Sequence, residues 1–154
     1  MMKRILKVAL PIMAALPILF YVAIVMVNNA IANDIEKALK DYALPAETAV
    51  VKSVSAARKL TGSGNGMQYM GALLVSSNLA EQELKAHYAE FAFVEVKPQT
   101  SYELEFDTAT VSFGGSHFGD DPGEYYAIVC WDAEQSKWYN DDIAKWLDLD
   151  IRGH

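Results

Sequence analysis

The chain has 154 residues, with 20 acidic and 13 basic side chains and a net charge of −7. This balance excludes nucleic acid as a partner class, because a negative surface repels the phosphate backbone. The length suits one domain, and the single cysteine, Cys130, excludes an internal disulfide.

The first predicted element is an apolar stretch, residues 8–27, that contains no charged side chain. Twenty residues of helix rise roughly 30 Å, about the thickness of the hydrocarbon core of a bilayer. The stretch therefore predicts a transmembrane anchor that contacts the bilayer. Lys3, Arg4 and Lys7 precede it, and basic residues favour the cytoplasmic side, so residues 1–7 should form a cytoplasmic tail.

The same segment also has features of a secretory signal peptide, and the sequence leaves both interpretations open. Ala30 and Ala32 precede Asn33 in the small-residue pattern of a cleavage site. The apolar run is longer than the ~7–15 residues of an ordinary signal peptide, which favours the uncleaved anchor. Cleavage after Ala32 would instead release a secreted protein.

Residues 28–46 are predicted to form a helical linker between the anchor and the domain. Ile35 and Leu39 recur at helical spacing along one side of this segment. Pro45 should end the helix, because the residue before a proline avoids the helical conformation. Residues 47–154 then form the domain on the far side of the membrane.

The domain opens with a predicted β-hairpin over residues 47–76. Residues 47–60 are rich in Val, Thr and Ser, and residues 67–76 are apolar on both faces near their end. Between them, residues 61–66 hold three glycines and an asparagine, which readily adopt the positive φ of a tight turn. A helix over residues 78–91 should follow, capped by Asn78 with Glu81, since its apolar residues recur at helical spacing.

Short strands are expected to dominate the rest of the domain. We expect them at residues 92–97, 101–107, 109–113 and 124–131. The second alternates apolar and acidic residues, as a half-buried strand does, whereas the last is apolar on both faces, as a central strand is. Residues 142–149 favour a short helix, and residues 148–154 suit an extended edge.

This order of elements predicts an α+β fold. The transmembrane helix is followed by a small domain in which about five or six strands form a mainly antiparallel sheet. One or two helices should pack on this sheet.

The candidate metal site is a glycine-rich loop that holds His117, Asp120, Asp121 and Glu124. An imidazole and carboxylates can ligate a metal ion, or supply a base and the acid that orients it. The spaced pattern of a calcium-binding loop is missing, and Asp-Asp-Pro-Gly is also an ordinary turn sequence. The metal-site hypothesis therefore competes with a solvated turn.

Other residues with reactive chemistry have simpler interpretations. The glycines at 62–66 join two strands, which is typical of a hairpin turn and not of a phosphate-binding loop. Cys130 is predicted to be a buried small hydrophobe and His87 a histidine at the edge of the core. Asp150 and its charged neighbours, close to His154, suggest a strand face that is exposed to solvent. No catalytic residue and no cofactor are predicted.

The charge of the domain is uneven and bears on its partner. Residues 33–102 hold 8 acids and 7 bases, whereas residues 103–154 hold 12 acids and 3 bases. Such a surface is either a solvated exterior or a face for a basic protein or peptide.

We expect a single-pass membrane protein with its N-terminus in the cytoplasm and a non-enzymatic binding domain outside. A translocated domain without disulfides is more typical of a bacterial cell than of a eukaryotic secretory route. One alternative is a small surface hydrolase or metal-dependent enzyme that uses the His117 loop; a cleft around that histidine would favour it. Another is a protective partner of a basic secreted toxin, since an acidic surface attracts basic partners quickly.

Overall fold

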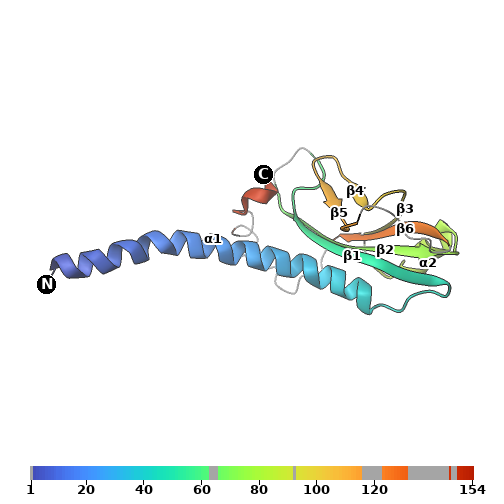
Figure 1. Ribbon diagram of the computed structural model, residues 1–154, viewed down its shortest axis with the longest axis horizontal. Helices are drawn as coiled ribbons and strands as arrows, with labels where there is room; N and C mark the ends of the chain where they lie inside the picture. Colours follow the sequence, from blue (N-terminus) through green and yellow to red (C-terminus); the bar gives the residue numbers. More distant parts are fainter. Residues whose placement is uncertain (1, 63–65, 92, 116–122, 132–145, 147–148) are drawn as a thin grey trace.

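The computed structural model describes residues 2–62, 66–91, 93–115, 123–131, 146 and 149–154. Within these residues, one long helix leads into a domain with six strands, a second helix and a short 3-10 helix (Figure 1). The helices are α1 (Met2–Asp41), α2 (Glu81–His87) and η1 (Ile151–Gly153). The strands are β1 (Thr48–Arg58), β2 (Gln68–Ser77), β3 (Val94–Pro98), β4 (Glu103–Glu105), β5 (Thr110–Ser112) and β6 (Glu124–Trp131).

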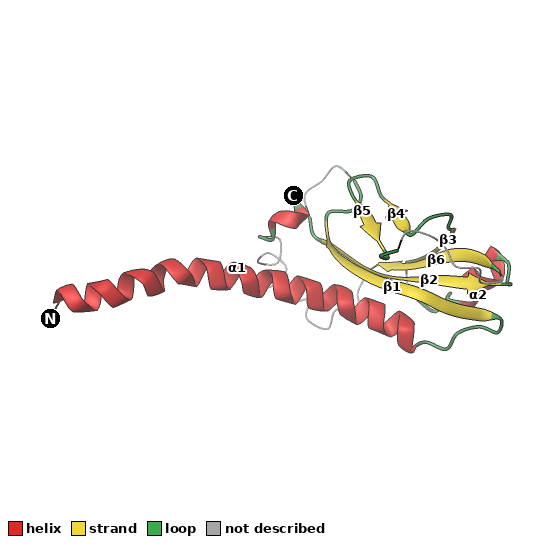
Figure 2. Cartoon of the chain, in the orientation of Figure 1, coloured by secondary structure: helices red, strands yellow, loops and turns green. Residues whose placement is uncertain are grey.

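The strands form two antiparallel sheets. The larger sheet has the order β1-β2-β6-β3, and the smaller one pairs β4 with β5. The two helices α1 and α2 pack on one face of the larger sheet, and the β4–β5 ribbon covers the other face (Figure 2). The predicted α+β fold with a mainly antiparallel sheet is confirmed.

The predicted hairpin is present and sets the register of the sheet. β1 and β2 pair from Thr48 opposite Ser77 to Arg58 opposite Gln68. The side chain of Gln68 accepts hydrogen bonds from the backbone N–H groups of Leu60 and Thr61, both at 2.7 Å. These bonds give both backbone N–H groups a hydrogen-bond partner where the chain leaves β1.

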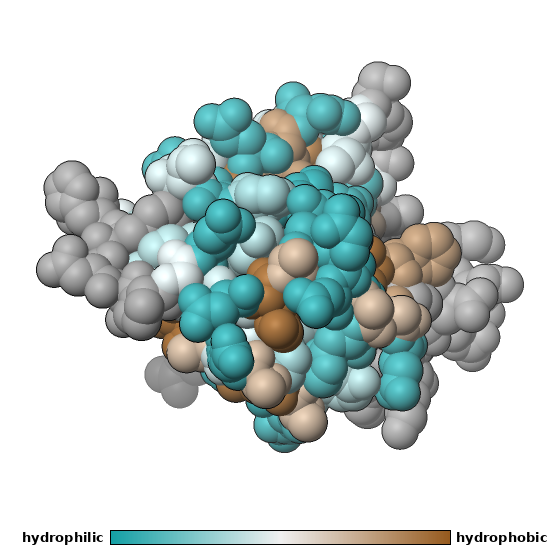
Figure 3. All heavy atoms as spheres, turned by 90° about the vertical axis from the view of Figure 1, so that its right-hand side faces the viewer, coloured by the Kyte–Doolittle hydropathy of each residue, from teal (hydrophilic) through white to brown (hydrophobic). Residues whose placement is uncertain are grey.

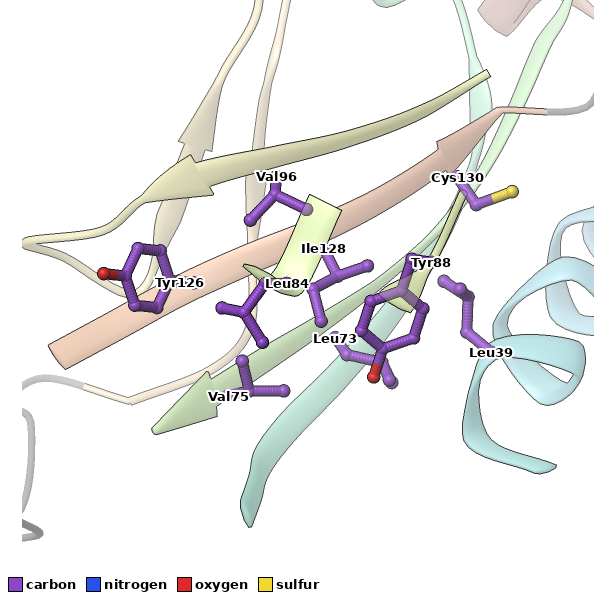
Figure 4. Close-up of a cluster of buried hydrophobic side chains, with 9 residues drawn as sticks. All are labelled: Leu39, Leu73, Val75, Leu84, Tyr88, Val96, Tyr126, Ile128 and Cys130. Atoms are coloured by element: carbon purple, nitrogen blue, oxygen red, sulfur yellow. The ribbon is translucent and has the colours of Figure 1, made fainter. Parts of the chain in front are cut away.

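The first half of the core lies between the helices and the sheet (Figure 4). It includes Leu39 from α1, Leu84 from α2 and Tyr88, which follows α2 directly. The Tyr88 hydroxyl is buried and has no hydrogen-bond partner among the described residues. Its burial, as the larger cause, and the nearby Tyr42, as the smaller one, raise the pKa of Tyr88 to about 12. The ring is therefore held by packing and not by its hydroxyl.

The second half of the core lies under the β4–β5 ribbon. Leu104 of β4 and Val111 of β5 are buried against even-numbered residues of β2, while Glu103 and Glu105 are exposed. The alternation predicted for this strand is thus confirmed, although β4 is shorter than residues 101–107. β6 lies between β2 and β3, and both of its faces are buried because the helices cover one face of the sheet and the β4–β5 ribbon covers the other.

Helix α2 is shorter than the predicted span 78–91, for a reason visible at its start. The backbone N–H of Asn78 donates to the carbonyl of Glu47 at 3.2 Å and so extends the hairpin contact. The helix is capped two residues later, where the carboxylate of Glu83 accepts from the N–H of Ala80 at 2.9 Å. The capping pattern was therefore present, but the predicted pair was the wrong one.

The C-terminal residues differ from the extended edge expected at 148–154. Residues 151–153 form η1, and the Asp150 side chain accepts from the backbone N–H of Arg152 at 3.1 Å. This cap explains the difference, because an aspartate before a turn competes with an extended strand for the backbone donor. The helix predicted at 142–149 falls largely outside the described residues.

Helix α1 continues without a break past the apolar run and lies along the sheet. It approaches β2 closely at Gly71, where an added Cβ would overlap the backbone nitrogen of Glu36. Real Cβ atoms do not come so close to a backbone atom, so only glycine allows this helix–sheet spacing.

We predict that Gly71→Ala lowers the free energy of unfolding of the full chain in detergent micelles by ~1–3 kcal/mol, as overpacking of a tight contact does. Urea titration followed by near-UV circular dichroism measures it. Ala49→Val, at an exposed position of β1, is the control and should change little. An unchanged stability of Gly71→Ala would contradict the proposed steric constraint.

Candidate functional site: the junction between helix α1 and the domain

The predicted metal loop is only partly within the described residues. His117, Asp120 and Asp121 lie outside them, and Glu124 stands at the start of β6. Its carboxylate accepts a hydrogen bond from the Tyr126 hydroxyl at 2.6 Å, which raises the pKa of Tyr126 to about 12. Within the described part of the chain, no group of three His, Cys, Asp or Glu residues could hold a metal ion. The metal-site hypothesis therefore stays a prediction.

The other chemically reactive residues have structural surroundings. Cys130 is buried in the core cluster beside Ile128, as predicted. The Nε2 atom of His87 lies 2.6 Å from the carbonyl oxygen of Ala43, which makes Nε2 the donor, and the ring packs on Tyr42. His87 is thus an edge histidine with a backbone partner, and it fixes the loop that leaves α1.

The N-terminal part of α1 is exposed and apolar. Its exposed large side chains between residues 12 and 22 are Ile12, Met13, Leu16, Ile18, Leu19, Phe20 and Val22. Among the described residues, α1 is the one helix that is long and apolar enough to cross a membrane. In Figure 1 this part projects away from the domain.

The C-terminal part of α1 buries one face against the domain. The contacting residues recur three or four positions apart, which keeps them on one side of the helix; they are Ile24, Asn28, Ile31, Ala32, Ile35 and Leu39. Opposite them lie Ala57 of β1 and Tyr69 of β2, with Met67 just before β2. One helix therefore has two environments, with a change near Ile24.

A buried polar contact lies where these two environments meet. Asn28 is fully buried, and its side-chain amide donates to the carboxylate of Asp150 at 3.0 Å. The Tyr69 hydroxyl donates to the amide oxygen of Asn28 at 2.8 Å. Since a buried amide without partners is costly, these bonds specify how α1 sits on the sheet.

An ion pair ties η1 to the same place. The Arg152 guanidinium donates to both oxygens of the Asp150 carboxylate, from Nε at 3.0 Å and from Nη2 at 2.6 Å. Its Nη1 atom donates to the side-chain oxygen of Asn29 at 2.9 Å. Burial alone would raise the pKa of Asp150, but the hydrogen bonds from Arg152 and Asn28 lower it to about 2. We call Asn28, Asn29, Tyr69, Asp150 and Arg152 the polar junction.

Backbone contacts also hold η1 to the hairpin. The carbonyl of Arg152 accepts from the N–H of Lys59 at 2.7 Å, and the carbonyl of Gly153 accepts from the N–H of Gly66 at 2.8 Å. An added Cβ on Gly153 would lie 3.0 Å from the backbone nitrogen of Met67. Gly66, at the end of the hairpin turn, and Lys59, just after β1, thus hold η1 in place.

Sequence reasoning missed the polar junction. Asp150 was expected on a wet strand face, but it is fully buried. A signal existed in the pair Asn28 and Asn29, which interrupts an otherwise apolar helix face. Its partner lies 122 residues away, and no local pattern connects the two.

The chain matches no protein-family model, and no curated protein or solved structure is similar to it in the comparisons made. The functional interpretation therefore depends on the geometry of α1 and of the polar junction.

We predict that Asp150→Asn lowers the free energy of unfolding at pH 7 by about 2 kcal/mol, because the Arg152 guanidinium loses its charged partner. Folding lowers the pKa of Asp150 from 3.8 to about 2, so the stability from its charge is present above about pH 4 and lost toward pH 2. The difference between wild type and variant should shrink over that range.

Thermal unfolding measured between pH 2 and pH 7 tests this dependence. Glu105→Gln, which removes an exposed carboxylate from β4, is the matched control and should follow the wild type. An equal deficit of Asp150→Asn at pH 2 and pH 7 would contradict an ionic role for Asp150.

Proposed function

We propose that the chain is a single-pass membrane protein whose α1 crosses the bilayer and presents the acidic domain as a binding module outside the cytoplasm. The observation that carries this proposal is the division of one continuous helix into an exposed apolar part and a part packed on the sheet. An exposed apolar surface of this length needs an apolar environment, and a bilayer supplies one.

The packing of α1 favours an anchor that is not removed. Cleavage after Ala32 would detach Ile24, Asn28 and Ile31, all of which are buried against the domain. It would also leave the Asp150 carboxylate without the amide of Asn28 and expose Tyr69. A signal peptide that is discarded does not need such contacts with the mature protein.

Charge supports the proposed orientation. The basic residues Lys3, Arg4 and Lys7 lie before the apolar run, and all 20 acidic residues of the chain lie after it. Basic flanks stay on the cytoplasmic side, so the domain is proposed to lie outside.

The proposed partner is a basic protein or peptide. Glu103 and Glu105 are exposed on β4, on the side of the ribbon that faces away from the core, and Asp107 follows them. The end of the domain opposite to the N-terminus of α1 is largely hydrophilic, with a few small apolar areas (Figure 3). The exposed carboxylates of β4 suit recognition by charge, which speeds encounter with a partner of opposite sign.

Alkaline carbonate extraction of cell membranes tests the anchor. The full chain should stay in the pellet, and a reporter fused after His154 should be active only outside the cytoplasm. Leu16→Lys with Leu19→Lys should release the protein, because each charge in the centre of a span costs about 2.5–3.5 kcal/mol. The matched control Leu16→Ile with Leu19→Ile should remain bound. Wild-type chain in the supernatant would overturn the proposal.

Crosslinking in intact cells tests the partner. We expect capture of a protein or peptide with net positive charge, and a loss of most of this capture in Glu103→Lys with Glu105→Lys. Thr110→Ser, a neutral change on the exposed side of the same ribbon, should leave capture unchanged. Capture that is insensitive to both salt and charge reversal would contradict recognition by the acidic strand.

A further inference from the structure

Around Asp150, the described part of the C-terminal segment has a polar side chain inside and apolar side chains outside. Asp150 is fully buried, whereas its neighbours Leu149 and Ile151 are 56% and 71% exposed. Trp146, just before them, is 59% exposed. A segment that faces water has the opposite arrangement, so this pattern indicates an apolar environment on the outer side of the segment. We call Trp146, Leu149 and Ile151 the apolar edge.

The apolar edge is continuous with the exposed part of α1. The ring of Trp146 packs edge-on against the ring of Phe20, with 5.4 Å between the ring centroids. Phe20 is itself exposed and belongs to the uncharged run. In Figure 1, η1 lies beside the middle of α1, where hydrogen bonds from Lys59 and Gly66 hold it to the hairpin. The apolar surface of the helix therefore extends sideways onto the chain end.

The length of the helix gives the depth of this contact. Phe20 lies seven residues before the end of the uncharged run at Val27, which is roughly 10 Å along a helix. If the hydrocarbon layer ended at Val27, Trp146 would lie within it. If instead the layer ended at Phe20, Trp146 would lie at the interface. Both limits place Trp146 in contact with lipid.

We propose that the apolar edge inserts into the interfacial layer of the same membrane that α1 crosses, so that the domain lies directly on the bilayer. This inference depends on the proposed membrane anchor and adds a second contact with lipid. Tryptophan suits this layer, because its ring is apolar and its N–H can reach water or a headgroup.

The polar junction lowers the free-energy cost of placing the charged residues Asp150 and Arg152 next to the bilayer. The Asp150 carboxylate and the Arg152 guanidinium bond to each other and to Asn28 and Asn29, so their charges are paired next to the bilayer. An unpaired carboxylate at this depth would oppose insertion, whereas a paired one does so much less. The junction thus holds the segment that carries the apolar edge beside α1.

Quenching by brominated phospholipids tests the proposal on the full chain in phosphatidylcholine vesicles. The double variant Trp131→Phe with Trp138→Phe leaves Trp146 as the only tryptophan of the chain. The fluorescence emission of Trp146 should be blue-shifted, and lipids that carry bromine near the headgroup should quench most of it. The matched control, Trp138→Phe with Trp146→Phe, leaves Trp131, whose indole N–H bonds to Glu95 on the sheet. Its emission should be unaffected by bromolipid.

A second probe does not depend on removing Trp131. Ile151→Cys in a Cys130→Ala background carries a spin label, and Ser112→Cys in the same background is its water-facing control. The label at residue 151 should collide more with oxygen than with a water-soluble nickel complex, and the label at residue 112 should do the reverse.

The outcomes separate this inference from the anchor. A chain that resists carbonate extraction while Trp146 is quenched by aqueous iodide and not by bromolipid keeps the anchor and overturns the apolar edge. Shielding of Trp146 from both quenchers, together with a dimer in crosslinking, would assign the edge to a second copy and also overturn the proposal. Extraction of the chain by carbonate overturns both.

Discussion

The close packing of the second half of α1 on the sheet is the constraint on which the rest of the structure depends. Gly71 allows the helix backbone to approach β2, and Leu39 of α1 belongs to the same buried cluster as Leu84 of α2. Because α1 is one unbroken helix, any element packed on its second half is positioned relative to its first half as well. The exposed apolar part and the domain are thus oriented by packing and not by a flexible connection.

The polar junction adds specificity to this packing. A purely apolar contact between a helix and a sheet tolerates rotation or sliding at modest cost, whereas a buried amide that needs a carboxylate does not. Asn28 bonds to Asp150 and Tyr69, which come from the chain end and from β2. The junction therefore joins three distant parts of the sequence, and a shift of α1 along the sheet would break all of these bonds together.

The sequence predicted what local patterns encode. Alternation along residues 101–107, the glycine-rich turn at 61–66 and the uniformly apolar strand ending at Trp131 were sufficient for the fold class and the hairpin, which are confirmed. Local patterns failed where a distant group decided the outcome. Asn78 pairs with Glu47 instead of capping α2, and Asp150 is buried because Asn28 and Arg152 are beside it. The candidate metal residues other than Glu124 lie outside the described structure.

The proposed membrane anchor is also a structural element of the domain, and this determines how the domain would meet the proposed partner. In the proposed arrangement, the span ends where the sheet begins, and no stalk separates the domain from the lipid. The face of the β4–β5 ribbon is on the opposite side of the larger sheet from α1, so its acidic residues remain open to water. A basic partner would then approach from the side of the domain away from α1, where negative charge on Glu103 and Glu105 attracts it over about one Debye length, roughly 8 Å at physiological salt.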